Sequence, residues 1–277
     1  MEYLPNELEN IIKDYIIFKP QNKNELREAV NLWCDNKEEA LTKYGHISLW
    51  DTSLITDMSQ LFIWQKEFND NVNNWDVSLV TNMRSMFNGA STFNQPLNSW
   101  KVSKVTNMEN MFSGAELFNQ PLNSWNVSSV TNMENMFNNA ESFNQPLDSW
   151  DVSNVTNICF MFWGADKFNH PINSWDVSSV TDMSYMFEYA SSFNQPLYLW
   201  NVSSVTNMHD MFSGAESFNQ PLDTWDISNV TDIENMFFNA KSFNQSLNSW
   251  NTSSVIYQDG IFYGTPSFDT EKNAHWY

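Results

Sequence analysis

Histidine and cysteine side chains are frequent ligands of transition metals, and both can act as nucleophiles. The chain contains four histidines and two cysteines. No histidine stands beside another at the spacing of metal ligands, and His170 replaces a glutamine of a repeated pattern, which predicts a solvated substitution. Cys159 has no partner along the sequence and is predicted to be an inert thiol. We therefore expect no catalytic residue, no bound metal and no cofactor.

Tryptophan recurs nine times at an interval of 25 residues, from Trp50 to Trp250. Read from each tryptophan, the unit is W-[DN]-V-S-x-V-T-[ND]-M-x-x-M-F-x-x-A-x-x-F-N-Q-P-L-x-x, and its positions are numbered here as offsets from that tryptophan. A fixed period predicts a stack of identical structural units, in which neighbours bury each other's apolar side chains. The tryptophans themselves are predicted to be buried.

Asp or Asn fills offsets 1 and 7 in most units, and repeated carboxylates can bind Ca²⁺. Calcium-binding repeats need glycine turns and a high density of carboxylates, whereas asparagine often replaces aspartate here. Turn formation and helix capping explain both columns. Asparagine at offset 19 predicts a ladder of stacked amides that satisfies buried backbone groups.

The predicted fold class is an α/β repeat solenoid, with one short helix and one or two short parallel strands in each 25-residue unit. Apolar residues at offsets 8, 11, 12 and 15 have the spacing of one helix face, so a helix is expected at offsets 7–16. The Trp-x-Val segment is expected to be extended and to pair with its copies. Because packed helices need more room than paired strands, the solenoid should curve.

The motif W-D-V-S-x-V-T-N-M-x-x-M-F resembles the BspA-type surface-protein repeat, a relative of the leucine-rich repeat that is best known in bacterial surface lipoproteins. The resemblance covers about residues 20–265. It implies a leucine-rich-repeat-like solenoid used for adhesion or protein binding. The segment from Phe18 to Ile47 also looks like the leader that often precedes such arrays.

The sequence around the repeats predicts four parts: a first helix at 1–19, a helical N-terminal cap at 20–49, eight complete units at 50–249, and a degenerate ninth unit with a C-terminal cap at 250–277. Such caps shield the apolar flanks of the end units.

Within the N-terminal cap, Asn24 is predicted to cap a helix, and a second helix at 36–44 is expected to close at Gly45. The first of these helices has one apolar face, made of Leu26, Ala29, Val30 and Trp33. Phe268 and Trp276 are expected to finish the stack at its other end.

Residues 4–17 contain L-P-x-E-L-x-x-I-I, which places proline at a helix start and Leu8 and Ile11 on one apolar face. This pattern is similar to the opening of an F-box, the helical module that docks adaptor subunits of ubiquitin ligases. The resemblance implies an adaptor-binding helix. The apolar pattern alone fits a capping helix equally well.

The formal net charge of −20 argues against nucleic acid as a partner, since binding phosphates needs many lysines and arginines. It argues equally against anionic membrane surfaces. The sequence shows no secretory signal, no apolar run long enough to span a membrane and no lipid-anchor pattern. These features predict no membrane insertion and an intracellular location, such as a host-cell cytoplasm or a virion.

Aromatic residues at the variable offsets of two consecutive units give the candidate binding site. The predicted partner-binding residues are Phe160, Trp163, Tyr185 and Tyr189. On the expected helices they would project outward as one patch, and exposed aromatic clusters mark interfaces. The alternative is that these rings fill gaps between units.

The sequence favours a non-enzymatic scaffold that binds a protein partner, because no acid, base or nucleophile set converges. Two other functions stay open: a surface or adhesive structural protein, and an F-box-like substrate receptor of a ubiquitin ligase. The sequence does not set the oligomeric state.

Overall fold

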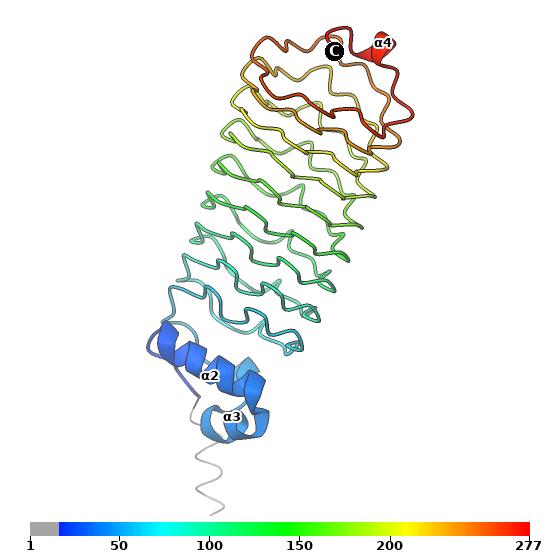
Figure 1. Cartoon of the computed structure of the whole chain (residues 1–277). Coiled ribbons are helices and arrows are strands. Elements are labelled where there is room, and N and C mark those ends of the chain that lie inside the picture. The colour runs from blue at the N-terminus through cyan, green and yellow to red at the C-terminus, as the bar shows by residue number, and fades with distance from the viewer. Residues whose placement is uncertain (1–16) are drawn as a thin grey trace, which may run out of the picture.

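The computed structural model describes residues 17–277, which form an elongated stack of turns with a helical pair at one end (Figure 1). The pair consists of α2 (Lys23–Asp35) and α3 (Lys37–Tyr44), followed by the short 3₁₀ helix η1 (Ile47–Leu49). A single turn of helix, α4 (Thr270–Asn273), lies near the C-terminus. Within the described residues no helix is long and apolar enough to cross a membrane. The predicted F-box-like helix, including Leu8 and Ile11, lies outside the described residues except for its last position.

The α2–α3 pair closes the N-terminal flank of the stack. Helix α2 is capped by Asn22, two residues before the predicted Asn24, because the Asn22 side chain accepts hydrogen bonds from the amides of residues 24 and 25. Its buried face is the predicted one, Leu26, Ala29, Val30 and Trp33. Trp33 packs edge-on against Trp50, with ring centroids 6.0 Å apart, and so covers the first tryptophan of the array. Helix α3 ends at Gly45, whose φ of 70° favours glycine.

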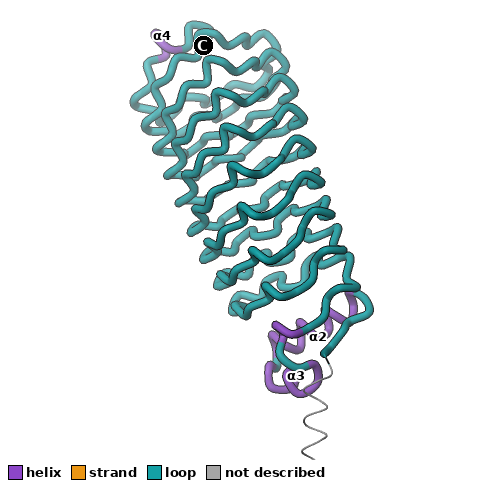
Figure 2. Tube along the Cα trace, turned by 180° about the vertical axis from the view of Figure 1, so that it is seen from behind, coloured by secondary structure: helices purple, strands orange, loops and turns teal. Residues whose placement is uncertain are grey.

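The repeat array contains neither the predicted helices nor the predicted strands, so the α/β solenoid prediction is wrong. From residue 50 to 269 the backbone consists of turns and irregular segments, drawn as loops in Figure 2. The only ladder pairing among the described residues is a series of isolated parallel bridges at offset 7, which begins with Asp57 and Asn82 and ends with Asp232 and Tyr257. The repeats are therefore built from loops.

Hydrogen bonds between units replace the expected helix. In the third unit the amides of Met108, Asn110 and Phe112 donate to carbonyls of the next unit at 3.0, 2.8 and 2.9 Å. The backbone turns back at offsets 10 and 14, where φ is positive in every unit. The amide of Met111 meanwhile bonds the carbonyl three residues back. A series of tight turns can therefore have the same spacing of apolar residues as a helix face. These turns bury the same residues and form hydrogen bonds with the matching turns of the next unit.

The invariant aromatic residues form three columns through the core. The nine tryptophans are only 2–4 % exposed, as predicted. Phenylalanines at offset 12 stack on one another across units, as Phe112 does on Phe137 with centroids 5.7 Å apart. A parallel column at offset 18 stacks in the same way. Within a unit the two phenylalanines also stack, as Phe112 does on Phe118 with centroids 4.1 Å apart, so each ring packs against its own unit and against the same ring of its neighbours.

The buried indole N–H groups are satisfied by backbone carbonyls of the preceding layer. Trp125 Nε1 donates to the Leu97 carbonyl at 3.0 Å, and Trp150 Nε1 donates to the Leu122 carbonyl at 3.1 Å. Burying an indole N–H group without a hydrogen-bond partner would destabilise the fold. The tryptophan ladder consequently fixes the register of successive units as well as filling the core.

The polar columns also have structural roles. The Asn94 side-chain oxygen accepts the Asn119 amide at 3.0 Å, and the same contact recurs along offset 19, so the predicted amide ladder is present. It runs along a partly exposed surface rather than a buried one. The Asp or Asn of offsets 1 and 7 accepts the amide two residues ahead, as Asn107 does from Glu109 at 2.8 Å. This is turn formation as predicted, although no helix follows.

The stack runs nearly straight instead of curving (Figure 1). The predicted curvature required wide helices on one side, and loop-built units have none. At the C-terminal end Trp276 stacks on Trp250 with centroids 6.1 Å apart and donates its Nε1 hydrogen to the Leu247 carbonyl at 2.8 Å. It thereby takes the place of a further tryptophan rung and finishes the ladder.

Candidate functional site

The four predicted partner-binding aromatic residues lie together on one face of two adjacent units. Phe160 and Tyr185 stand at offset 10 of successive units, and their rings stack with centroids 4.3 Å apart. Trp163 and Tyr189 meet edge to face at 6.0 Å. Only Tyr189, at 51 % exposed, projects well into solvent, whereas the other three are half-buried. The prediction that these rings project outward from helices is wrong. The array has no helices there, and the rings pack against one another across units as a strip along the surface.

The backbone at three of these positions is unfavourable for large side chains. Phe160, Tyr185 and Tyr189 have φ values of 57°, 58° and 56°. Asn or Gly often occupies the same offsets in other units, and these residues tolerate a positive φ, whereas bulky residues rarely adopt it. Such strain is characteristic of functional sites. The aromatic residues are therefore placed there against the local backbone preference.

A carboxylate lies between the rings of the strip. Trp163 Nε1 donates to Glu188 Oε2 at 2.6 Å, which ties the indole to the next unit. Burial raises the pKa of Glu188 to about 7, and the Trp163 hydrogen bond opposes that rise. The pKa of the Tyr189 hydroxyl is raised chiefly by the nearby Glu188 charge. This carboxylate is thus poised to change its charge near neutral pH.

The strip continues into a third unit through His209. The His209 ring meets Tyr185 edge to face at 5.0 Å, and its Nε2 lies 2.8 Å from Asp210 Oδ2. Burial raises the pKa of Asp210. We define the aromatic–acidic strip by six residues, which are Phe160, Trp163, Tyr185, Glu188, Tyr189 and His209.

A family model described as "Mycoplasma protein of unknown function, DUF285" matches residues 33–144, 100–197, 123–220 and 171–276. These overlapping matches cover the whole array. The chain belongs to the DUF285 family. No curated protein and no solved structure matches it.

The DUF285 matches overlap because the family model spans several units at once and fits the array in more than one register. The match is therefore carried by the repeated core columns. The aromatic–acidic strip consists of departures from that repeat. What distinguishes this DUF285 chain must be sought in the strip and in its other departures.

Sequence reasoning found the four aromatic residues but missed Glu188 and His209. The positions of both residues within the repeat could have indicated them. Glu188 stands at offset 13, the same offset as Trp163 in the preceding unit, and His209 follows Tyr185 by nearly one period. Cys159 is buried, as an inert thiol should be, and burial raises its pKa to about 12. The thiol keeps its proton at neutral pH and does not contribute a nucleophile.

Glu188→Gln should stabilise the protein at neutral pH and leave its stability unchanged at pH 4. The folded-state pKa of Glu188, about 7, lies above the ordinary 4.5, so its contribution to stability is complete below pH 4.5 and is lost as pH rises to 7. Glutamine removes this loss and can still accept the Trp163 hydrogen bond. Solvent screening at a half-buried site limits the gain to about 1 kcal/mol.

Urea unfolding at pH 4, 6 and 8 measures this effect. The exposed Glu141→Gln variant serves as the control and should show no such trend. A Glu188→Gln gain that is equal at all three pH values would contradict the assignment of a raised pKa to this carboxyl group.

Proposed function

We propose that this DUF285 protein is a non-enzymatic scaffold that binds a protein partner through the aromatic–acidic strip. The observation that carries the proposal is the clustering of Phe160, Trp163, Tyr185 and Tyr189 on one face, three of them at backbone positions unfavourable for large residues. Large aromatic side chains at a partly exposed surface are the usual anchors of protein interfaces. The resemblance of the repeat to BspA-type repeats, which serve adhesion and protein binding, supports the same function.

The strip favours a partner that presents arginine or lysine. Aromatic faces attract guanidinium and ammonium groups, and the Glu188 carboxylate adds negative charge beside them as it ionises above about pH 7. The formal net charge of −20 steers basic partners toward the surface in general. We therefore expect an extended basic segment of another protein to lie across the two units.

Replacing Trp163 and Tyr189 by serine should weaken binding of basic peptides by about 10- to 100-fold without unfolding the array. The probe is a set of fluorescent peptides of equal length that carry arginine, lysine, glutamate or serine, measured by anisotropy. Arginine peptides should bind most tightly, and added salt should weaken them.

The matched control replaces Phe238 and Tyr263, a second stacked pair on the array surface with centroids 5.4 Å apart. Tyr263 is 71 % exposed, more than any residue of the strip, yet this pair lies outside it. The control should bind basic peptides like the unmodified protein. Equal losses in both variants, or no binding of any basic peptide, would contradict the proposal.

A further inference from the structure

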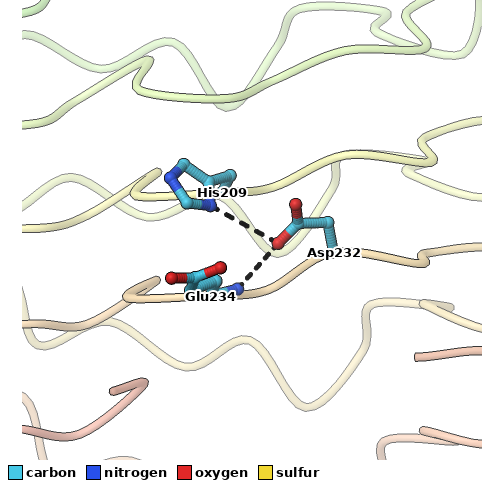
Figure 3. A group of neighbouring side chains, drawn as sticks. All are labelled: His209, Asp232 and Glu234. Carbon is cyan, nitrogen blue, oxygen red and sulfur yellow. Dashed lines mark hydrogen bonds and ion pairs between the residues drawn. The ribbon is translucent and has the colours of Figure 1, made fainter. Parts of the chain in front are cut away.

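Three potential metal ligands converge where two units meet at the end of the strip, with which they share His209 (Figure 3). His209 stands at offset 9 of one unit, and Asp232 and Glu234 stand at offsets 7 and 9 of the next. The parallel bridge between Asn207 and Asp232 holds the two segments in register. One ligand atom from each of the three side chains lies within 4.8 Å of the others.

The histidine has an unpaired nitrogen that faces this group. Its Nε2 lies 2.8 Å from Asp210 Oδ2, so in neutral imidazole the proton belongs on Nε2 and the lone pair on Nδ1. His209 Nδ1 is buried and has no hydrogen-bond partner. Its nearest charged neighbour is Asp232 Oδ1 at 3.5 Å. A buried lone pair that faces a carboxylate is unfavourable unless a cation lies between them.

We propose that His209, Asp232 and Glu234 bind a divalent transition metal, with Zn²⁺ as the representative ion. Two ligand atoms about 2.0–2.1 Å from a tetrahedral zinc ion lie about 3.4 Å apart, close to the separation of Nδ1 and Asp232 Oδ1. The Glu234 amide holds Asp232 Oδ1 in place at 2.9 Å. Solvent or a partner's side chain completes the coordination.

Asp210 acts as the positioning residue for the metal ligand. A metal-binding histidine commonly donates its other ring hydrogen to a carboxylate, which fixes the ring and increases its basicity. Asp210 occupies this position at Nε2, whereas Asp232 lies at Nδ1.

One nitrogen with two carboxylates suits zinc, cobalt or manganese better than calcium. Calcium prefers six to eight oxygen ligands, and magnesium keeps most of its water. The site differs from the rest of its column, where Glu109 and Glu134 occupy offset 9 of adjacent units without a histidine. That acidic pair provides a natural comparison inside the same molecule.

The test is calorimetric titration of the tag-free chain with Zn²⁺, with Co²⁺ absorption to report nitrogen coordination. We expect one site per chain. His209→Asn should abolish specific binding and the Co²⁺ signal, and Asp210→Asn should weaken binding by about 10- to 100-fold. Glu234→Gln changes a proposed ligand. Its matched control is Glu134→Gln, which should leave the Zn²⁺ affinity unchanged. Ca²⁺ should not compete.

Two outcomes would overturn the proposal. If His209→Asn binds Zn²⁺ as tightly as the unmodified chain, the ion is held by acidic surface charge alone. If no saturable site exists, the three side chains do not form a metal site. The Trp163 and Tyr189 double serine variant should keep the metal site, so that this proposal and the proposed peptide-binding function can fail separately.

Discussion

Replacing Trp150 with alanine should lower the free energy of unfolding by about 3–5 kcal/mol. The ring is 3 % exposed and stacks on Trp175 with centroids 6.5 Å apart. Its removal opens a cavity in the middle of the ladder and removes one of the two donors to the Leu122 carbonyl, which keeps only the Trp125 amide. Because a repeat array couples only neighbouring units, the loss should also separate the two halves of the stack.

Urea unfolding followed by circular dichroism measures the Trp150→Ala effect, which should appear as a large loss of stability and a broadened or divided transition. Trp276→Ala is the matched control, since Trp276 also stacks on a tryptophan and also bonds a carbonyl, but at the end of the ladder. It should cost about 1–2 kcal/mol because it disturbs one neighbour only. Equal costs for the two variants would contradict a continuous ladder.

Gly214→Ala should destabilise the protein by about 2–4 kcal/mol, for two separate reasons. Gly214 has a φ of 67°, which costs energy for any residue with a Cβ. A Cβ there would also lie 2.5 Å from Tyr189 Cδ1, because the tyrosine ring covers this glycine across the unit boundary. The substitution therefore strains the backbone and displaces a ring of the strip.

Gly114→Ala isolates the backbone term. Gly114 has a φ of 68°, but the nearest atom to its added Cβ is Gly89 Cα at 3.4 Å. Its cost should be about 1–2 kcal/mol. Combining Gly214→Ala with Tyr189→Ser should bring the cost of the glycine substitution down to that of Gly114→Ala, as measured in a double-mutant cycle. If Tyr189→Ser gives no relief, the ring does not lie against Gly214.

The sequence predicted the core columns of this protein and mispredicted their backbone. A fixed period and an apolar pattern are enough to place Trp125 and Phe137 in a shared core, because any stacked arrangement buries identical columns together. The helix prediction failed because the spacing of offsets 8, 11, 12 and 15 is not unique to a helix. The Asn and Gly residues at offsets 10 and 14 were the signal for positive φ, and they indicated turns.

The candidate sites were predictable in part for a similar reason. Large aromatic residues at offsets that are otherwise polar, such as Trp163 and Tyr189, can be recognised from the repeat alone. The His209 group is not, since its members come from two units and only an in-register stack brings Nδ1 of one unit to the carboxylates of the next. The co-ligands of His209 stand at related offsets of the next unit and far from it along the chain.

We propose that the invariant columns support the fold and that the aromatic–acidic strip binds the partner. The most direct test replaces five of the six strip residues by those at the same offsets of the third unit, which are Asn110, Ser113 and Gly114. The substitutions are Phe160→Asn, Trp163→Ser, Tyr185→Asn, Glu188→Ser and Tyr189→Gly. Peptide affinity and urea unfolding of this variant are measured side by side. We predict that cooperative unfolding is retained and binding of arginine peptides is lost. Retained binding, or loss of cooperative unfolding, would contradict this division of roles between the core columns and the strip.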